Sequence, residues 1–198
     1  MLTVAGIGPG NPKYLTMEVL EEIQNSEYIL AFGRVAKSLE GIRKDIVEIN
    51  KVEDVIKYIK GKEKVLLLAS GDPCFFGIIE FLKRKAIEID KVLPGLSSFQ
   101  YLMASLGKSW ENGRFLSLHG REDSLDKVKE NRLSIILTDR VNTPSFISRS
   151  LDDLNIRGLM HVGYNLSYEN EVIKTIKIGE ELEDMSSLAV VVVENEMD

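Results

Sequence analysis

The chain has 198 residues, of which 44% are hydrophobic, a net charge of -6 and one cysteine, Cys74. This length fills one large or two small globular domains, and a single cysteine excludes an internal disulfide and a cysteine-clustered zinc site. Because the charge is negative and no basic block, signal-peptide pattern or long apolar run is present, we expect a soluble cytoplasmic protein that binds neither nucleic acid nor membranes.

The first half of the chain alternates apolar runs with helical patterns. Leu2 to Ile7 is typical of a buried strand, and it leads through a glycine turn into a helix in which Leu15, Val19 and Ile23 recur at helical spacing. Further strands are expected at 28–31, 46–49, 65–69 and 87–93, and helices at 52–59, 75–85 and 97–106. Residues 65–69 are apolar throughout, as in a central strand buried on both faces. This alternation predicts a mostly parallel sheet.

The charged stretch 108–114 interrupts this pattern, so we place a domain boundary there, between domains at 1–110 and 114–198. Beyond it, strands are expected at 115–118, 134–137, 159–164, 172–176 and 188–193, with one helix at 145–154. The last three strands follow one another without a helix between them, which favours antiparallel pairing. The predicted fold is α/β with two αβα domains, the first built on a mostly parallel sheet and the second on a mixed one.

The glycines of Gly6-Ile7-Gly8-Pro9-Gly10 would let the backbone approach a ligand, although a tight turn without a ligand explains them equally well. The segment is not a Walker A loop, because no Gly-Lys-Ser/Thr follows, and it is not G-x-G-x-x-G, because the third glycine comes one residue early. No acidic residue ends the second strand, where a ribose-binding carboxylate would lie. These features disfavour NAD binding.

Two more turns follow expected strands, Ser70-Gly71-Asp72-Pro73 and Pro94-Gly95-Leu96-Ser97-Ser98. Asp72 could accept hydrogen bonds from a ribose, but taken alone it is better explained as an Asx-type turn that binds its own backbone. Ser97 or Ser98 could cap the following helix, contact a ligand, or do both. Since loops at the carboxyl ends of parallel strands gather along one edge, the three turns predict a shared small-molecule site.

Polar residues of the second half are ambiguous. Arg121, after His119-Gly120, is suited to clamp a carboxylate but equally to a solvated surface. His119 and His161 are the only histidines, and without a nearby third ligand they predict no metal site. Asp139-Arg140 and the segment 165–171 follow strands, and either line a site or are polar loops.

Taken together and in this order, the turns at Gly6–Gly10, Ser70–Pro73 and Pro94–Ser98 resemble those of the tetrapyrrole methylase family, and the resemblance extends from Met1 to about Val193. It implies a two-domain α/β methyltransferase that holds S-adenosyl-L-methionine in a cleft between the domains and releases S-adenosyl-L-homocysteine. It also implies a homodimer.

Within the family, the chain most resembles members that methylate C5 of cobalt-precorrin-7 in anaerobic cobalamin biosynthesis. The residues that suggest this are Leu118-His119-Gly120-Arg121, Leu137-Thr138-Asp139 with Asn142 to Pro144 after it, and Asn165-Leu166 with Glu171 downstream. The resemblance then implies functional pairing with a separate decarboxylating C15-methyltransferase. Four alternatives stay open: methylation of uroporphyrinogen III, methylation of a diphthamide precursor, a regulatory domain that binds the cofactor without catalysis, and a doubly wound domain that binds another nucleotide.

By resemblance, the methionine and ribose of the cofactor would lie against Asp72, Phe75 and the Ser97-Ser98 turn. The cofactor-binding residues implied in this way are Gly8, Pro9, Gly10, Ser70, Gly71, Asp72, Phe75, Ser97, Ser98, Leu137, Thr138, Asp139, Ser187 and Leu188. Arg34, Arg121 and Arg140 are candidates for binding substrate carboxylates, because they lie near predicted cleft loops. The sequence identifies no catalytic base; Asp72, Asp139 and Glu171 are the candidates.

Overall fold

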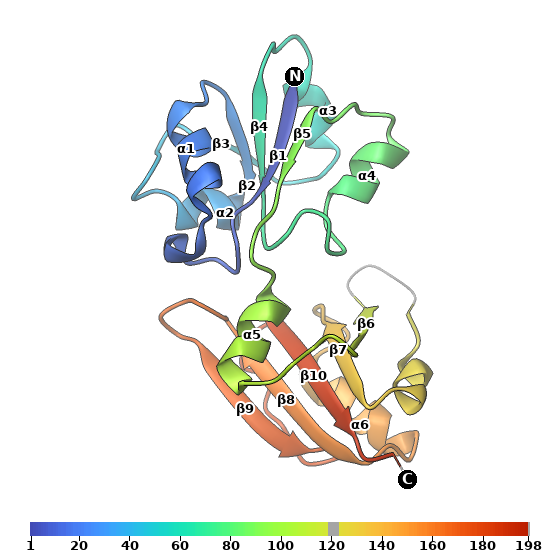
Figure 1. The fold of residues 1–198 in the computed structure, drawn as a ribbon. Helices are drawn as coiled ribbons and strands as arrows, with labels where there is room; N and C mark the ends of the chain where they lie inside the picture. The colour runs from blue at the N-terminus through green and yellow to red at the C-terminus, as the bar shows by residue number, and fades with distance from the viewer. Residues whose placement is uncertain (119–122, 198) are drawn as a thin grey trace. The chain divides into compact units, whose positions relative to one another are not determined.

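Two compact units, Met1–Ser98 and Phe99–Asp198, make up the computed structural model, which describes residues 1–118 and 123–197 (Figure 1). Each unit contains one five-stranded sheet, parallel in the first and mixed in the second. The predicted α/β class and both predicted sheet types are thereby confirmed. The domain limits at 1–110 and 114–198 stay a prediction.

The first sheet has the order β3-β2-β4-β1-β5, and all its strands are parallel. Its strands are β1 (Leu2–Gly6), β2 (Ile29–Phe32), β3 (Val47–Ile49), β4 (Val65–Ala69) and β5 (Lys91–Leu93). Its helices are η1 (Pro12–Tyr14), α1 (Met17–Asn25), α2 (Gly33–Ser38), α3 (Asp54–Ile59) and α4 (Ile79–Arg84). β1 and β4 are buried along their whole length, because each has a neighbour on both sides and helices over both faces.

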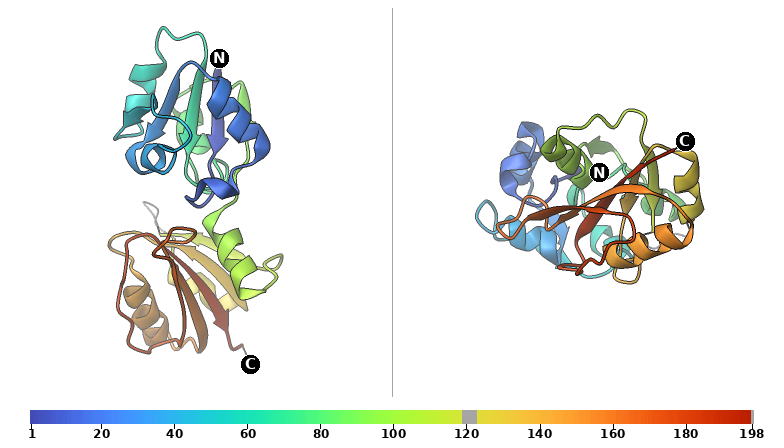
Figure 2. Two further views of the ribbon diagram at one scale, coloured as in Figure 1. Left: turned by 90° about the vertical axis from the view of Figure 1, so that its left-hand side faces the viewer. Right: turned by 90° about the horizontal axis from the view of Figure 1, so that it is seen from below.

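Helices cover both faces of this sheet, with α1 on one side and α3 on the other (Figure 2). The face under α1 and α2 packs Val19 and Ile23 against strand residues such as Ala5. Val19 and Ile23 are four residues apart and so lie on one side of α1, whose first turn is capped by the Thr16 hydroxyl, 3.2 Å from the Val19 nitrogen. The opposite face is packed by α3 and α4.

The second sheet has the order β6-β7-β10-β8-β9, in which only β6 and β7 are parallel. Its strands are β6 (Arg114–Ser117), β7 (Leu133–Leu137), β8 (Gly158–Tyr164), β9 (Val172–Lys177) and β10 (Ala189–Asn195). Its helices are α5 (Ser98–Leu106), η2 (Leu125–Glu130) and α6 (Pro144–Asp153). As predicted from the lack of helices between them, β8, β9 and β10 pair antiparallel.

One core of this unit lies between the sheet and α6, where Ile147 and Leu151 contact Val162 and other alternate strand residues. Aromatic rings join α5 to β6: the Phe99 ring lies 4.9 Å from that of Phe115 and 5.2 Å from that of Trp110, both edge to face. These contacts explain why nearly all of α5 belongs to the second unit.

Local backbone features shorten two expected elements. The helix expected at 75–85 begins only at Ile79, because the residues before it form a turn in which Phe76 has a φ of 49°. The strand expected at 87–93 is reduced to Lys91–Leu93, since Ala86, with a φ of 53°, turns the chain after α4. Helix α2 was not expected. No helix among the described residues is long and apolar enough to span a membrane.

Candidate functional site

In the first unit, the three predicted turns follow three neighbouring strands. β1 lies between β4 and β5, and because all three run parallel their carboxyl ends meet at one edge of the sheet. The turns at Gly8, Asp72 and Ser97 therefore lie on the same edge, as the sequence analysis expected.

Backbone contacts join these turns directly. The Gly8 nitrogen donates to the Gly71 oxygen at 3.3 Å, and the Gly71 nitrogen donates to the Gly8 oxygen at 2.8 Å. A Cβ added to Gly6 would lie 2.4 Å from the Gly71 oxygen and 2.7 Å from the Gly95 nitrogen. These glycines let three backbones approach closer than any side chain would allow.

The Asp72 carboxylate links the second turn to the third. Its Oδ1 accepts from the Cys74 nitrogen at 2.7 Å, which is the expected Asx-type turn, and its Oδ2 accepts from the Gly95 nitrogen at 3.4 Å. A carboxylate has about four lone-pair sites, so two remain for a ligand hydroxyl or cation. Asp72 thus combines a structural role with capacity for a ligand.

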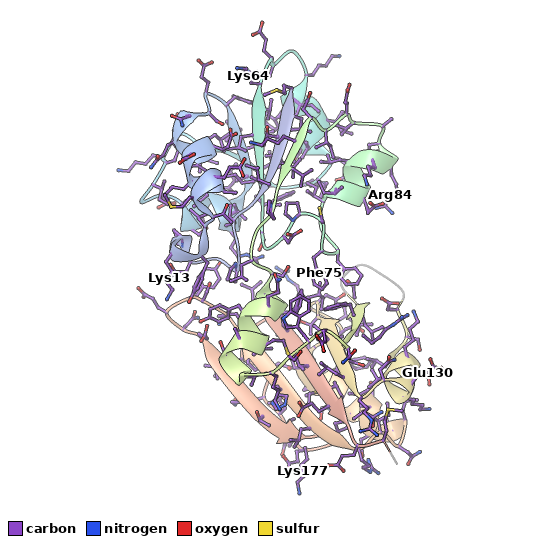
Figure 3. The ribbon with its side chains drawn as sticks, in the orientation of Figure 1. Lys13, Lys64, Phe75, Arg84, Glu130 and Lys177 are labelled. Atoms are coloured by element: carbon purple, nitrogen blue, oxygen red, sulfur yellow. The ribbon has the colours of Figure 1, made fainter. Side chains whose placement is uncertain are left out.

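Four of the predicted site residues follow the strands that end at this edge. Phe75 follows Asp72 on the loop after β4 (Figure 3), where its half-buried ring lies 4.9 Å from the Phe76 ring. Ser97 is buried, and Ser98 is the first residue of α5. Arg34, at the carboxyl end of β2, is exposed.

The second unit gathers its predicted residues in a similar way. The carboxyl ends of β6, β7 and β8 lie at the same edge as the amino ends of β9 and β10, since Leu137 pairs with Ser117 and Val190, and Tyr164 with Ala189 and Val172. Thr138 and Asp139, Asn165 and Glu171, and Ser187 and Leu188 flank these strand ends.

Local hydrogen bonds hold the turn after β7. Asp139 Oδ1 accepts from the nitrogens of Val141 and Asn142, at 2.8 and 2.6 Å, and both of its oxygens also accept from Asn142 Nδ2. Thr138 Oγ1 donates to the Ala189 oxygen at 2.8 Å, which ties β7 to the start of β10. Arg140, between Asp139 and Val141, is exposed.

A second set of bonds surrounds Leu188. Its nitrogen donates to Ser186 Oγ at 3.1 Å, and its oxygen accepts from the Asn165 nitrogen at 2.9 Å. Ser186 Oγ in turn donates to Asn165 Oδ1 at 2.7 Å. Asn165 has a φ of 46°, a conformation that asparagine tolerates better than most residues. The main chain at Leu188 is thereby held by Asn165, the residue that directly follows β8.

Burial and hydrogen bonds act on several ionisable groups near this edge. Burial raises the pKa of Tyr164 to about 12, aided by the nearby charges of Asp184 and Glu183. Burial also disfavours the Asp184 carboxylate, but hydrogen bonds from Ser145 outweigh this and lower its pKa. Glu171 Oε2 accepts from the Ser167 nitrogen at 2.6 Å.

The two histidines and Arg121 were considered as ligand-binding residues in the sequence analysis. His119 and Arg121 lie outside the described residues. His161 is buried in β8, with Nδ1 2.7 Å from Thr175 Oγ1 and Nε2 3.3 Å from Glu194 Oε2, so its neighbours are protein groups. Among residues 1–118 and 123–197, no group of three or more His, Cys, Asp or Glu side chains is placed to hold a metal ion.

Sequence reasoning did not identify the partners that hold these turns. The Gly6 and Gly95 contacts are spatial, and no spacing rule shows that two glycines 89 residues apart will touch. Asp184 was also missed, and Asn142 was not recognised as a hydrogen-bond partner of Asp139. For Asn142 a signal existed, because Asp-x-x-Asn before a Thr-Pro helix start is typical of a hydrogen-bonded turn.

Comparison with known protein families matches residues 1–181 to the Tetrapyrrole (Corrin/Porphyrin) Methylases. Among the relatives that match almost end to end are two from different organisms. The probable cobalt-precorrin-7 C(5)-methyltransferase of Methanocaldococcus jannaschii is 28% identical, over 99% of both chains. The cobalt-precorrin-7 C(5)-methyltransferase of Salmonella typhimurium is 29% identical, over 98% of this chain and 99% of its own. By contrast, the probable cobalt-factor III C(17)-methyltransferase of M. jannaschii is 32% identical over only 54% of this chain and 47% of its own.

Solved structures share the fold. The precorrin-6Y methylase of Archaeoglobus fulgidus superposes with a TM-score of 0.77, covering 100% of this chain and 99% of its own at 22% identity. The uroporphyrin-III C-methyl transferase of Thermus thermophilus, solved in complex with S-adenyl homocysteine, has a TM-score of 0.75 over 97% of this chain and 91% of its own at 20% identity. Both likenesses concern the fold.

Proposed function

This chain belongs to the tetrapyrrole methylase family, and from that membership we propose that it transfers a methyl group from S-adenosylmethionine to C5 of cobalt-precorrin-7. The observation that carries the substrate assignment is the extent of the matches. Relatives named for C5 methylation match 98–99% of this chain, whereas the C17 methyltransferase named above matches 54%. A full-length match includes the second unit.

The polar groups at the two sheet edges suit the cofactor. Asp72 has lone pairs left for ribose hydroxyls or an ammonium group, and Gly8 and Gly71, with φ values of 77° and 66°, leave the backbone uncovered. We propose that Asp72, Phe75 and the Ser97-Ser98 turn bind the methionine and ribose portions. Thr138, Asp139, Ser187 and Leu188 are proposed to bind the adenosine portion.

When bound, S-adenosylmethionine would supply an already activated methyl group: a bond would form between the substrate carbon and the methyl carbon while the bond from methyl carbon to sulfur breaks, and S-adenosylhomocysteine would leave with that electron pair on sulfur. The chain is then required to align the reactants and exclude water. None of the three candidate bases is free of local bonds: Asp72 and Asp139 organise their own turns, and Glu171 binds the Ser167 nitrogen. No described residue is therefore assigned as a catalytic base.

Three further features belong to the proposal. Arg34 and Arg140, both exposed, would bind carboxylates of the substrate, and Arg121 is a third candidate. The protein would act as a homodimer in the cytoplasm, in functional pairing with a separate decarboxylating C15-methyltransferase. Light scattering on the purified chain tests the dimer.

Anaerobic incubation with cobalt-precorrin-7 and cofactor labelled with deuterium at the methyl group tests the reaction. Mass analysis should find one labelled methyl group per corrinoid. Uroporphyrinogen III and the diphthamide precursor serve as competing acceptors, and labelling of either one instead would retain the family and overturn the substrate. Tight binding of S-adenosylhomocysteine without turnover on any acceptor would favour a regulatory domain.

A further inference from the structure

The connection between β9 and β10 has no regular secondary structure from Ile178 to Leu188, yet it leads into two residues of the proposed cofactor site, Ser187 and Leu188. An irregular segment of this length has many conformations in solution unless specific contacts restrict it. The position of Ser187 and Leu188 therefore depends on what anchors the segment.

Asp184 provides an anchor at the start of α6. Its Oδ1 accepts from the Ser145 nitrogen at 2.9 Å, and its Oδ2 accepts from Ser145 Oγ at 2.6 Å. Ser145 is the second residue of α6, where backbone N–H groups lack partners within the helix and a negative charge is favoured. The Asp184 carboxylate thus accepts a backbone N–H of α6 that has no partner within the helix. The same bond holds the segment around Asp184, 39 residues after Ser145 in the chain, against α6.

Two more contacts hold the segment on either side of Asp184. The Tyr164 hydroxyl, at the end of β8, donates to the Glu183 oxygen at 3.3 Å. Ser186 bonds Asn165 and the Leu188 nitrogen, as described above. Residues 183–186 are consequently tied to both α6 and β8 immediately before the proposed cofactor residues.

We infer that Asp184 is a positioning residue for cofactor binding: through Ser145 it fixes the segment that presents Ser187 and Leu188. This inference rests on the proposed function, because it requires the cofactor to bind at this edge. Asp184 itself need not touch the ligand. Its effect is to remove conformational freedom before binding, so that less is lost when the cofactor binds.

Calorimetric titration with S-adenosylhomocysteine tests this in D184N, S145A and the double variant. D184N should raise the dissociation constant about fivefold, the size of one lost helix cap. S145A removes only the bond from Ser145 Oγ and keeps the one from the Ser145 nitrogen, so it should raise the dissociation constant less, and the double variant should be little weaker than D184N. E181Q is the matched control, because Glu181 is exposed in the same segment and its carboxylate has no described partner. It should bind like the wild type.

Hydrogen exchange separates positioning from general destabilisation. In D184N the amides of 183–188 should exchange faster than in the wild type while those of β1 and β4 do not change, and saturating S-adenosylhomocysteine should restore protection. In turnover assays, D184N should raise the KM for the cofactor and leave kcat at saturating cofactor within about twofold. Unchanged affinity in folded D184N and S145A would overturn the inference while leaving the proposed function intact. Failure of the wild type to bind S-adenosylhomocysteine would overturn both.

Discussion

The carbonyl oxygen of Gly71 lies in the space that a side chain on Gly95 would need: an added Cβ would come within 2.3 Å of it. Gly71 itself is different, since a Cβ there would meet nothing closer than the Ser97 Cα at 3.9 Å and only its φ of 66° is unfavourable for other residues. The two glycines therefore serve the same edge for different reasons.

Substituting these glycines should separate crowding from backbone strain. G95A should lower the free energy of unfolding by about 3 kcal/mol, because the obstructing atoms belong to the backbones of Gly6 and Gly71 and cannot rotate away. G71A should cost only about 1 kcal/mol, the penalty of a left-handed conformation. Urea unfolding followed by circular dichroism measures both, and equal losses would show that crowding at Gly95 is unimportant.

Replacing Asp72 by asparagine should weaken cofactor binding without unfolding the first unit. The asparagine Oδ1 still accepts from the Cys74 nitrogen, so the Asx turn persists, while the bond from the Gly95 nitrogen and the charge that would hold ligand hydroxyls or an ammonium group are lost. A loss of about 2 kcal/mol corresponds to roughly thirtyfold weaker binding of S-adenosylhomocysteine by calorimetry. D153N, at an exposed acid on α6, is the control. Equal affinity of D72N and the wild type would remove Asp72 from the site.

Tyr164 should make stability depend on alkaline pH. Its pKa is raised from 10.0 to about 12, so its contribution is fully present below pH 10 and is lost as the pH rises through 12. Absorbance titration should show one tyrosine that ionises later than the others. In Y164F this late step should be missing, and the alkaline loss of stability should be smaller. A Y164F titration identical to that of the wild type contradicts the assignment.

Glu194 should have the opposite pH dependence. Burial raises its pKa, but its bonds to Lys108 Nζ, at 2.8 Å, and His161 outweigh this and lower it from 4.5. Its contribution is therefore present above pH 4.5 and is lost as the pH falls through the lowered value. E194Q should cost about 1 kcal/mol at pH 7, a modest figure because the carboxylate is one-third exposed, and less at pH 3, which lies below 4.5. E196Q, at the exposed end of β10, should match the wild type at both values.

The two sheet types could be predicted from the sequence, because the spacing of apolar residues and the order of strands and helices can be read along the chain. The fully apolar run Val65–Ala69 predicts a strand buried on both faces, and three strands without helices between them predict antiparallel pairing. It was insufficient for α4, since no propensity scale shows that Phe76 will adopt a positive φ. The association of α5 with the second sheet depends on Phe99 meeting Trp110 and Phe115, a tertiary contact without a sequence pattern.

The residues of the candidate site also fall into two groups, those that could be predicted from the local sequence and those that could not. Turn residues such as Asp72 and Ser97 were recognisable because glycine, proline and aspartate at a strand end carry their own geometry. Asp184 was not, because its role depends on Ser145, which is far away in sequence and close only in the folded unit. The direct contacts of the proposed site are local motifs, whereas the residues that orient them are long-range.

The position of β1 between β4 and β5 has a consequence for synthesis of the chain on the ribosome. Leu2 pairs with Val65 and Thr3 with Lys91, so β1 has no partner strand until some sixty further residues have been made, and its second partner comes later still. During this interval the apolar residues of β1 are exposed, which is a condition that promotes misfolding or association between nascent chains. The glycine turn that ends β1 is therefore made early but can acquire its final shape only after residue 95 has left the ribosome.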